Sequence, residues 1–170
     1  MKDSLEARML IDFSRASEIA RWSAANDVVM GGTSTGGLLA TANGTALFTG
    51  TVSFEGGGGF ASVRSDNAVH DLHGSRALIV RVRGDGKRYQ LRLRTTDERN
   101  GISYLAPFET ERERWLDVSL SSEAFQPSWR GHVIATIPAL EFEVVHSLGF
   151  LIADRQAGDF ALEIAWIAKG

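Results

Sequence analysis

The chain has 170 residues, of which 44% are hydrophobic and 23% charged, and its formal net charge is −3. This composition is that of an ordinary globular protein and excludes a disordered or fibrous one. The small negative charge provides no attraction to nucleic acid or to an anionic membrane, and the absence of cysteine excludes disulfides, thiolate metal ligands and cysteine nucleophiles. We expect a single domain over residues 1–170. Because the first twelve residues lack the apolar stretch of a signal peptide, we also expect a cytoplasmic location.

Short segments of alternating apolar and polar residues run along the chain and are separated by eighteen glycines and only three prolines. This pattern is typical of an all-β sandwich or barrel, and the lack of βαβ spacing argues against a parallel sheet. One short helix is predicted from Ser14 to Trp22, where Ser14 is suited to cap the first turn. Asn43-Gly44 tolerates positive φ and predicts a tight turn between strands at 38–42 and 45–48. The other predicted strands cover residues 60–65, 78–83, 88–94, 102–107, 115–120, 145–153 and 160–167.

The strands at 78–83 and 88–94 flank a four-residue loop, Gly84 to Lys87, and we expect this loop to close a hairpin. In that register Val82 faces Tyr89, and the alternation separates an apolar face from a basic one. The predicted apolar face holds Leu78, Val80, Val82, Tyr89, Leu91 and Leu93. The predicted basic face holds Arg81, Arg83, Arg88, Gln90, Arg92 and Arg94.

Five arginines on one face repel one another unless they are solvated or paired, so this face is the strongest chemical signal in the sequence. One interpretation is a solvated surface on which carboxylates of neighbouring strands pair with the arginines. The other is a concave surface where Arg92, Arg94 and Tyr104 engage a polar ligand, because guanidinium groups bind carboxylate or phosphate with two parallel hydrogen bonds. Nucleic acid is not expected as the partner, since acidic residues outnumber basic ones.

The tryptophans divide into a core candidate and a surface candidate. In the last strand Trp166 alternates with Phe160, Leu162 and Ile164, so we expect it to pack in the core. Trp129 is followed by Arg130-Gly131 in a predicted loop. A large ring beside arginine is typical of the residues that dominate protein–protein interfaces, so Trp129 and Arg130 are our candidates for a partner-binding surface.

Several short motifs match catalytic or metal sites but lack the required context. Gly32-Thr33-Ser34-Thr35-Gly36 has the spacing of a nucleophile elbow, which requires a strand turning into a helix. Asp27 and Ser34 either brace this glycine-rich loop or lie at the rim of a binding surface. The glycines at 56–59 are not followed by the Lys-Ser/Thr of a phosphate loop, and His70 and His73 have no identifiable third metal ligand. We therefore expect no enzyme, no metal and no cofactor.

A series of signatures, quoted in chain order, carries a family resemblance. They are Trp22-Ser23-Ala24-Ala25-Asn26-Asp27-Val28-Val29-Met30-Gly31-Gly32-Thr33-Ser34, Phe48-Thr49-Gly50, Gly56-Gly57-Gly58-Gly59-Phe60-Ala61-Ser62-Val63-Arg64, Arg83-Gly84-Asp85-Gly86-Lys87-Arg88-Tyr89, Trp115, Trp129-Arg130-Gly131, Leu148-Gly149-Phe150-Leu151-Ile152 and Phe160-Ala161-Leu162-Glu163-Ile164. From about Ile11 to Ile167 the chain resembles the complex I intermediate-associated protein family.

The resemblance implies a galactose-binding-like fold, that is, a jelly-roll-like β-sandwich of two antiparallel sheets. It also implies a non-catalytic assembly or chaperone-like factor that binds protein clients, with respiratory complex I as the client of eukaryotic members. Because such a fold hosts many functions, an alternative stays open. In that alternative the chain is a small-molecule or carbohydrate-binding domain that uses the arginine and aromatic surface.

Overall fold

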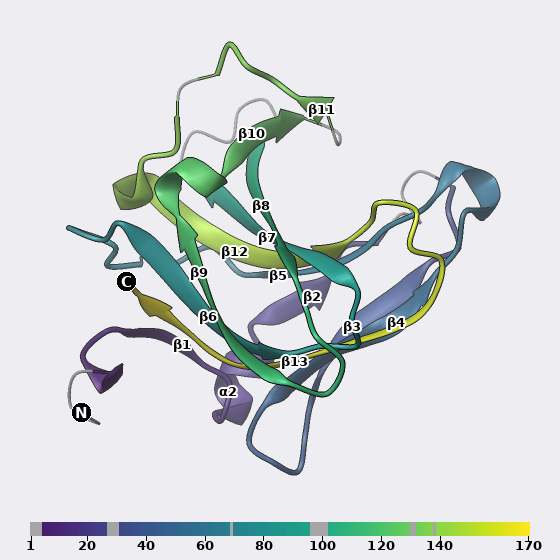
Figure 1. The fold of residues 1–170 in the computed structure, drawn as a ribbon, viewed down its shortest axis with the longest axis horizontal. Coiled ribbons are helices and arrows are strands. Elements are labelled where there is room, and N and C mark those ends of the chain that lie inside the picture. The colour runs from purple at the N-terminus through teal and green to yellow at the C-terminus, as the bar shows by residue number, and fades with distance from the viewer. Residues whose placement is uncertain (1–4, 27–30, 69, 96–101, 130–131, 138) are drawn as a thin grey trace.

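A computed structural model describes residues 5–26, 31–68, 70–95, 102–129, 132–137 and 139–170, and these form two antiparallel sheets packed face to face (Figure 1). Sheet A has the order β3-β4-β13-β6-β9, with β1 also paired to β13, and sheet B has the order β11-β10-β8-β7-β12-β5-β2. The prediction of an all-β antiparallel sandwich is therefore confirmed.

The strands of sheet A are β1 (Met9–Asp12), β3 (Thr35–Ala40), β4 (Ala46–Val52), β6 (Ala77–Arg83), β9 (Trp115–Ser121) and β13 (Gly158–Lys169). Those of sheet B are β2 (Trp22–Ala24), β5 (Ala61–Ser65), β7 (Arg88–Thr95), β8 (Ser103–Glu109), β10 (Gln126–Trp129), β11 (His132–Val133) and β12 (Val145–Ile152). The helical segments are α2 (Ala16–Ile19) and the short 3-10 turns η2 (Glu55–Gly57), η3 (Ser122–Ala124) and η4 (Phe142–Val144).

The predicted hairpin around Asn43-Gly44 is present as β3 and β4, and Gly44 has the positive φ of 73° that the turn requires. The two strands approach each other closely at Gly50. A Cβ atom at this position would overlap the carbonyl oxygen of Thr35, so no larger residue fits without a shift of the backbone.

The N-terminal helix is shorter than predicted, because α2 covers only Ala16–Ile19 and its cap is Arg15, which makes no side-chain capping bond. Trp22 belongs to β2, where its ring packs between Phe13 and Phe150 with centroid separations of 5.3 and 5.9 Å. Burial of this ring in the core outweighs the local preference for another helical turn.

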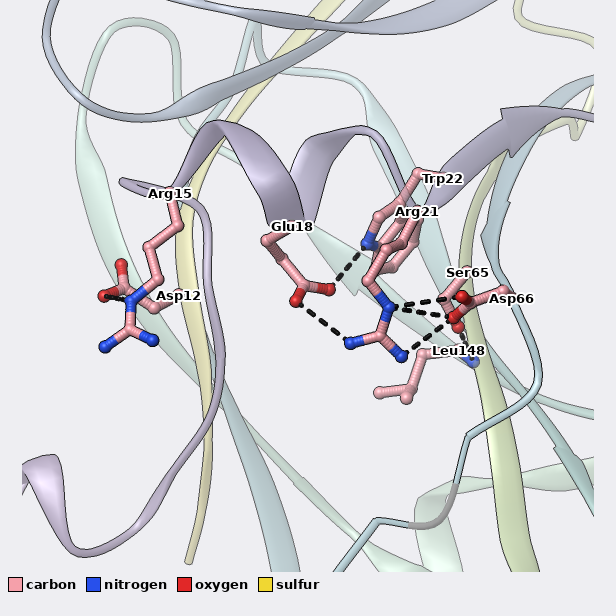
Figure 2. A network of polar contacts seen from close by, with 8 residues as sticks. All are labelled: Asp12, Arg15, Glu18, Arg21, Trp22, Ser65, Asp66 and Leu148. Atoms are coloured by element: carbon pink, nitrogen blue, oxygen red, sulfur yellow. Dashed lines mark hydrogen bonds and ion pairs between the residues drawn. The ribbon is translucent and has the colours of Figure 1, made fainter.

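A polar network fastens this N-terminal segment to the end of β5. Figure 2 shows the carboxylate of Glu18 accepting hydrogen bonds from the indole nitrogen of Trp22 at 3.2 Å and from Arg21 at 3.4 Å. The guanidinium of Arg21 also donates to Asp66 at 2.9 Å. These ion pairs lie at the surface, so we interpret the network as a structural tie.

The predicted hairpin between residues 78–83 and 88–94 is wrong. Strand β6 pairs with β13 and β9 in sheet A, whereas β7 pairs with β12 and β8 in sheet B. The loop therefore passes from one sheet to the other, and the apolar faces of the two strands meet across the core. All six residues of the predicted apolar face are fully buried: Leu78, Val80, Val82, Tyr89, Leu91 and Leu93. Alternation identifies the inward side chains, but it does not tell whether the next strand joins the same sheet or the facing one.

Asp85 holds this crossing loop in place. Its Oδ1 atom accepts hydrogen bonds from the Lys87 backbone amide at 3.1 Å and from the Tyr89 hydroxyl at 3.0 Å. Its Oδ2 atom accepts one from the Ala161 amide at 2.9 Å. Because Tyr89 belongs to sheet B and Ala161 to sheet A, one carboxylate links the two sheets.

The expected core position of Trp166 is also corrected. A register shift in β13 between Ile164 and Trp166 changes the face of the residues that follow. Ile167 is consequently buried in the core, while Trp166 is half-buried opposite Arg81 and Asp12 on the outer face of sheet A. A bulge of this kind leaves no signal in a pattern of alternating residues.

Candidate functional site

The arginines of the predicted basic face lie on two different outer faces, because β6 and β7 belong to different sheets. On sheet A, Arg81 makes an ion pair with Asp117 at 2.8 Å and lies over the ring of Trp115 at 5.3 Å. Arg83 reaches Glu163 at 4.0 Å. These two arginines fit the interpretation of a solvated face with paired charges.

The outer face of sheet B differs from this pattern. Arg88 is paired with Asp154 at 3.4 Å. Arg92 is half-buried, and its Nε donates to the hydroxyl of Ser103 at 3.1 Å. Among the carboxylates of the described residues, none lies within ion-pair distance of Arg92 or of Arg64 on β5.

Strand register brings Arg64 and Arg92 into one cross-strand row. Gly149 on β12 is opposite Arg64 on one side and opposite Arg92 on the other. Since neighbouring strands are about 4.8 Å apart, the two arginines start roughly 10 Å from each other with no side chain between them. A Cβ atom at position 149 would lie 2.7 Å from the carbonyl oxygen of Val63, so this gap is set by backbone packing.

Electrostatics shows that Arg94 belongs to the same group. Burial, then the positive charges of Arg94 and Arg64, lower the pKa of Arg92 to about 10. Arg92 nevertheless stays protonated at neutral pH, so the face carries a concentrated positive charge. We call Arg64, Arg92 and Arg94 the sheet B arginine cluster.

Tyr104 does not join this cluster, contrary to our expectation. It pairs with Leu93, whereas Leu105 pairs with Arg92, so Tyr104 points to the core side of sheet B. It is 7% exposed, and burial, with the negative charge of Glu141 as a second cause, raises its pKa. The expectation for Tyr104 was wrong because alternation alone does not show which residue of β8 lies beside Arg92. The pairing of β7 with β8 decides this.

Trp129 lies where an exposed aromatic candidate was expected. It ends β10, pairs with His132 of β11 and is 41% exposed. Its predicted neighbour Arg130 lies outside the described residues.

Ser34 is only 1% exposed. Its hydroxyl accepts a hydrogen bond from the Ser53 amide at 2.9 Å and donates to the Ser53 carbonyl at 3.1 Å. The structure thus gives Ser34 the bracing role and not a place at the rim of a binding surface. Asp27 lies outside the described residues, but its neighbour Asn26 braces the same region by accepting from the Ser62 amide at 3.1 Å.

Within the described part of the chain, no group of three or more histidine, aspartate or glutamate side chains could hold a metal ion. No helix there is long and apolar enough to cross a membrane.

Arg64 and Gly149 were not identified from the sequence as site residues. Arg64 is the exposed residue of β5, whereas the nearly uniform burial of β12 gives Gly149 no such signal. Their meeting with Arg92, however, depends on strands β5, β12 and β7 lying side by side, and these strands are far apart in the chain.

The fold is that of a β-sandwich of the kind found in carbohydrate-binding modules. A Family 11 carbohydrate-binding module from Clostridium thermocellum superposes with a TM-score of 0.67 over 96% of this chain and 95% of that one, at 12% identity. The agarase AgWH50C matches with a TM-score of 0.61 over 96% of this chain and 26% of that chain, at 10% identity. At such low identity the likeness concerns the fold alone.

The family model described as complex I intermediate-associated protein 30 (CIA30) matches residues 11–164, and the chain belongs to this family. The protein "Complex I intermediate-associated protein 30, mitochondrial" of Mus musculus is 26% identical over 182 residues, which cover 95% of this chain and 56% of that protein. Its Drosophila melanogaster counterpart is 25% identical and is covered to 62%. The chain thus spans about three-fifths of the length of the curated relatives that it matches. The predicted family is confirmed.

The expected cytoplasmic location is wrong. The relatives from Mus musculus, Drosophila melanogaster and Caenorhabditis briggsae all carry the word "mitochondrial" in their names. The composition and the start of the chain, on which the expectation was based, do not distinguish the two compartments.

Proposed function

We propose that the chain is a non-catalytic protein-interaction module that assists the assembly of a larger complex, with components of respiratory complex I as its partners. Membership of the complex I intermediate-associated family supports this role. So do the names of the relatives, which associate those proteins with an intermediate of complex I.

The observation that carries the proposal is an apolar edge at the end of sheet B. Strands β10 and β11 are the last two strands at one end of sheet B and lie at the top of the molecule in Figure 1. At this edge Trp129 is 41% exposed and Val133, on the opposite face, is 63% exposed. Exposed tryptophans of this kind frequently supply most of the energy of a protein interface, because they bury a large area with little loss of conformational freedom.

The serine of the motif that has the spacing of a nucleophile elbow supports a role without catalysis there. A nucleophilic serine must reach its substrate and must have a base within hydrogen-bond distance. Ser34 is 1% exposed, and its hydroxyl is engaged by the backbone of Ser53.

The carbohydrate alternative has less support. The Family 11 module, which shares the fold, was solved in complex with a mixed-linked tetrasaccharide. Small-ligand sites are commonly lined by aromatic rings, yet Tyr104 points to the core. None of the strand residues described on the outer face of sheet B is aromatic. We therefore do not propose a neutral glycan as ligand.

The test is affinity capture of the tagged protein from respiring host cells, with complex I subunits quantified by mass spectrometry. Trp129→Ala is the test variant. Phe54→Ala is its control, because Phe54 is also aromatic and is 48% exposed. Loss of an interface tryptophan typically weakens binding by about 2 kcal/mol or more, so we expect recovery with Trp129→Ala to fall at least about tenfold. Phe54→Ala should retain wild-type recovery.

Equal recovery with both variants would refute the assigned surface. Failure to recover complex I subunits with the wild-type protein would refute the assigned partner. Circular dichroism of both variants controls for folding.

A further inference from the structure

Arg64 and Arg92 of the sheet B arginine cluster have no role in the interaction surface proposed above, and their charges are arranged unlike those of the other outward arginines. Arg81, Arg83 and Arg88 each have a carboxylate partner. Arg64 and Arg92, by contrast, have none among the described residues, although Arg92 is half-buried. Like charges gathered on a partly desolvated surface repel one another, and the repulsion is relieved when an anion binds between them.

We propose that the outer face of sheet B binds a small phosphomonoester that also carries a hydroxyl group, with its phosphate held by Arg64 and Arg92 above Gly149. The existence of this site does not depend on the proposed interaction role.

The shape of the site favours phosphate over a single carboxylate. The hydrogen bond from Arg92 Nε to Ser103 fixes the plane of the guanidinium and leaves both Nη groups to bind a ligand. Gly149 keeps the space between Arg64 and Arg92 free of a side chain. A terminal phosphate has three oxygens and nearly two negative charges, so it can accept from several guanidinium groups at once. A carboxylate has two oxygens and one charge.

A second observation indicates the rest of the ligand. Gln90 is on the same face of β7 as Arg92, two residues earlier and therefore roughly 7 Å along the strand. Its amide oxygen, Oε1, is buried and makes no hydrogen bond within the described residues. Buried polar atoms in folded proteins almost always have a partner, so this oxygen lacks a donor. Because the atom is buried, rotation of the Gln90 side chain on ligand binding would bring it to a hydroxyl group one or two bonds beyond the phosphate ester.

The experiment titrates the folded protein at low salt with sn-glycerol 3-phosphate, inorganic phosphate or glycerol, followed by NMR signals of the arginine Nε–H groups. We expect saturable binding of both phosphates, tighter binding of glycerol 3-phosphate, and movement of the Arg92 signal. Hydrogen bonds to charged groups are strong, so Arg92→Gln and Arg64→Gln should each weaken binding by about tenfold. Gln90→Leu should remove the preference for glycerol 3-phosphate and leave the affinity for inorganic phosphate unchanged.

Arg81→Gln is the matched control, because Arg81 is an outward arginine of the other sheet with its own carboxylate partner. It should bind as the wild type does. The proposal is overturned if neither phosphate saturates the protein, or if Arg92→Gln, Arg64→Gln and Arg81→Gln bind alike. Arg64 is exposed, so Arg64→Gln keeps the test valid even if Arg92→Gln disturbs the fold. An equal affinity of Gln90→Leu and wild type for glycerol 3-phosphate would overturn the hydroxyl contact.

Discussion

Removal of the Asp85 carboxylate should destabilise the sandwich far more than removal of an ordinary surface carboxylate. Asp85 accepts three hydrogen bonds, from the Lys87 amide, the Tyr89 hydroxyl and the Ala161 amide. Tyr89 is fully buried, so its hydroxyl cannot turn to water when the carboxylate is lost. In Asp85→Ala the crossing loop also loses its side-chain hydrogen bond to the backbone of Ala161 in sheet A.

The expected magnitude follows from the number of donors left without a partner. Each buried donor that loses its acceptor lowers the free energy of unfolding by about 1–3 kcal/mol. With Tyr89 and Ala161 as the two affected donors, Asp85→Ala should lower it by about 2–6 kcal/mol, whereas the Lys87 amide can find water. Domains of this size are typically stable by about 5–15 kcal/mol, so the loss is a large part of the total.

Urea unfolding, followed by tryptophan fluorescence, measures this loss directly. Tyr89→Phe removes the buried hydroxyl, so the double variant Asp85→Ala/Tyr89→Phe should be less destabilised than the sum of the single variants. Asp117→Ala is the control, because the Asp117–Arg81 pair is exposed and should contribute less than about 1 kcal/mol. If Asp85→Ala costs no more than Asp117→Ala, the carboxylate does not hold the two sheets together.

Two further predictions concern the β3–β4 hairpin and a partly buried histidine. Gly50→Ala should lower the free energy of unfolding in urea by about 1–3 kcal/mol, because the added Cβ would overlap the backbone oxygen of Thr35. Gly37→Ala is the control: its Cβ would meet no atom within 4 Å, so this variant should unfold like the wild type. Similar unfolding of the two variants would show that the strands separate easily. Burial, then the charge of Arg21, lower the pKa of His70, so its neutral form is favoured in the folded state. The associated stability is present above the unfolded pKa of about 6.5 and is lost as the pH falls through the lower folded value. Melting temperatures between pH 7 and pH 5 should therefore drop less in His70→Gln than in the wild type, and parallel curves would exclude this contribution.

The candidate site could be predicted only in part. Arg92 and Arg94 were recognised because they alternate with buried leucines along one strand, and Trp129 because it precedes an Arg-Gly pair. Tyr104 was misplaced, and Arg64 and Gly149 were missed. Which residues of different strands lie side by side on one face of a sheet depends on the pairing of segments that are distant in the chain.

By itself, the sequence determined the fold class and the inward-facing residues, because the two-residue period of a strand records which side chains are buried. The alternation around Leu91 and Val80 predicted their burial correctly even though the predicted hairpin was wrong. Only the tertiary structure decided that β6 and β7 lie in opposite sheets and that a bulge turns Trp166 outward. It also decided that Arg64 and Arg92 flank Gly149. Burial of a side chain leaves a local trace in the sequence, whereas the choice of neighbouring strand is made by the packing of the whole core.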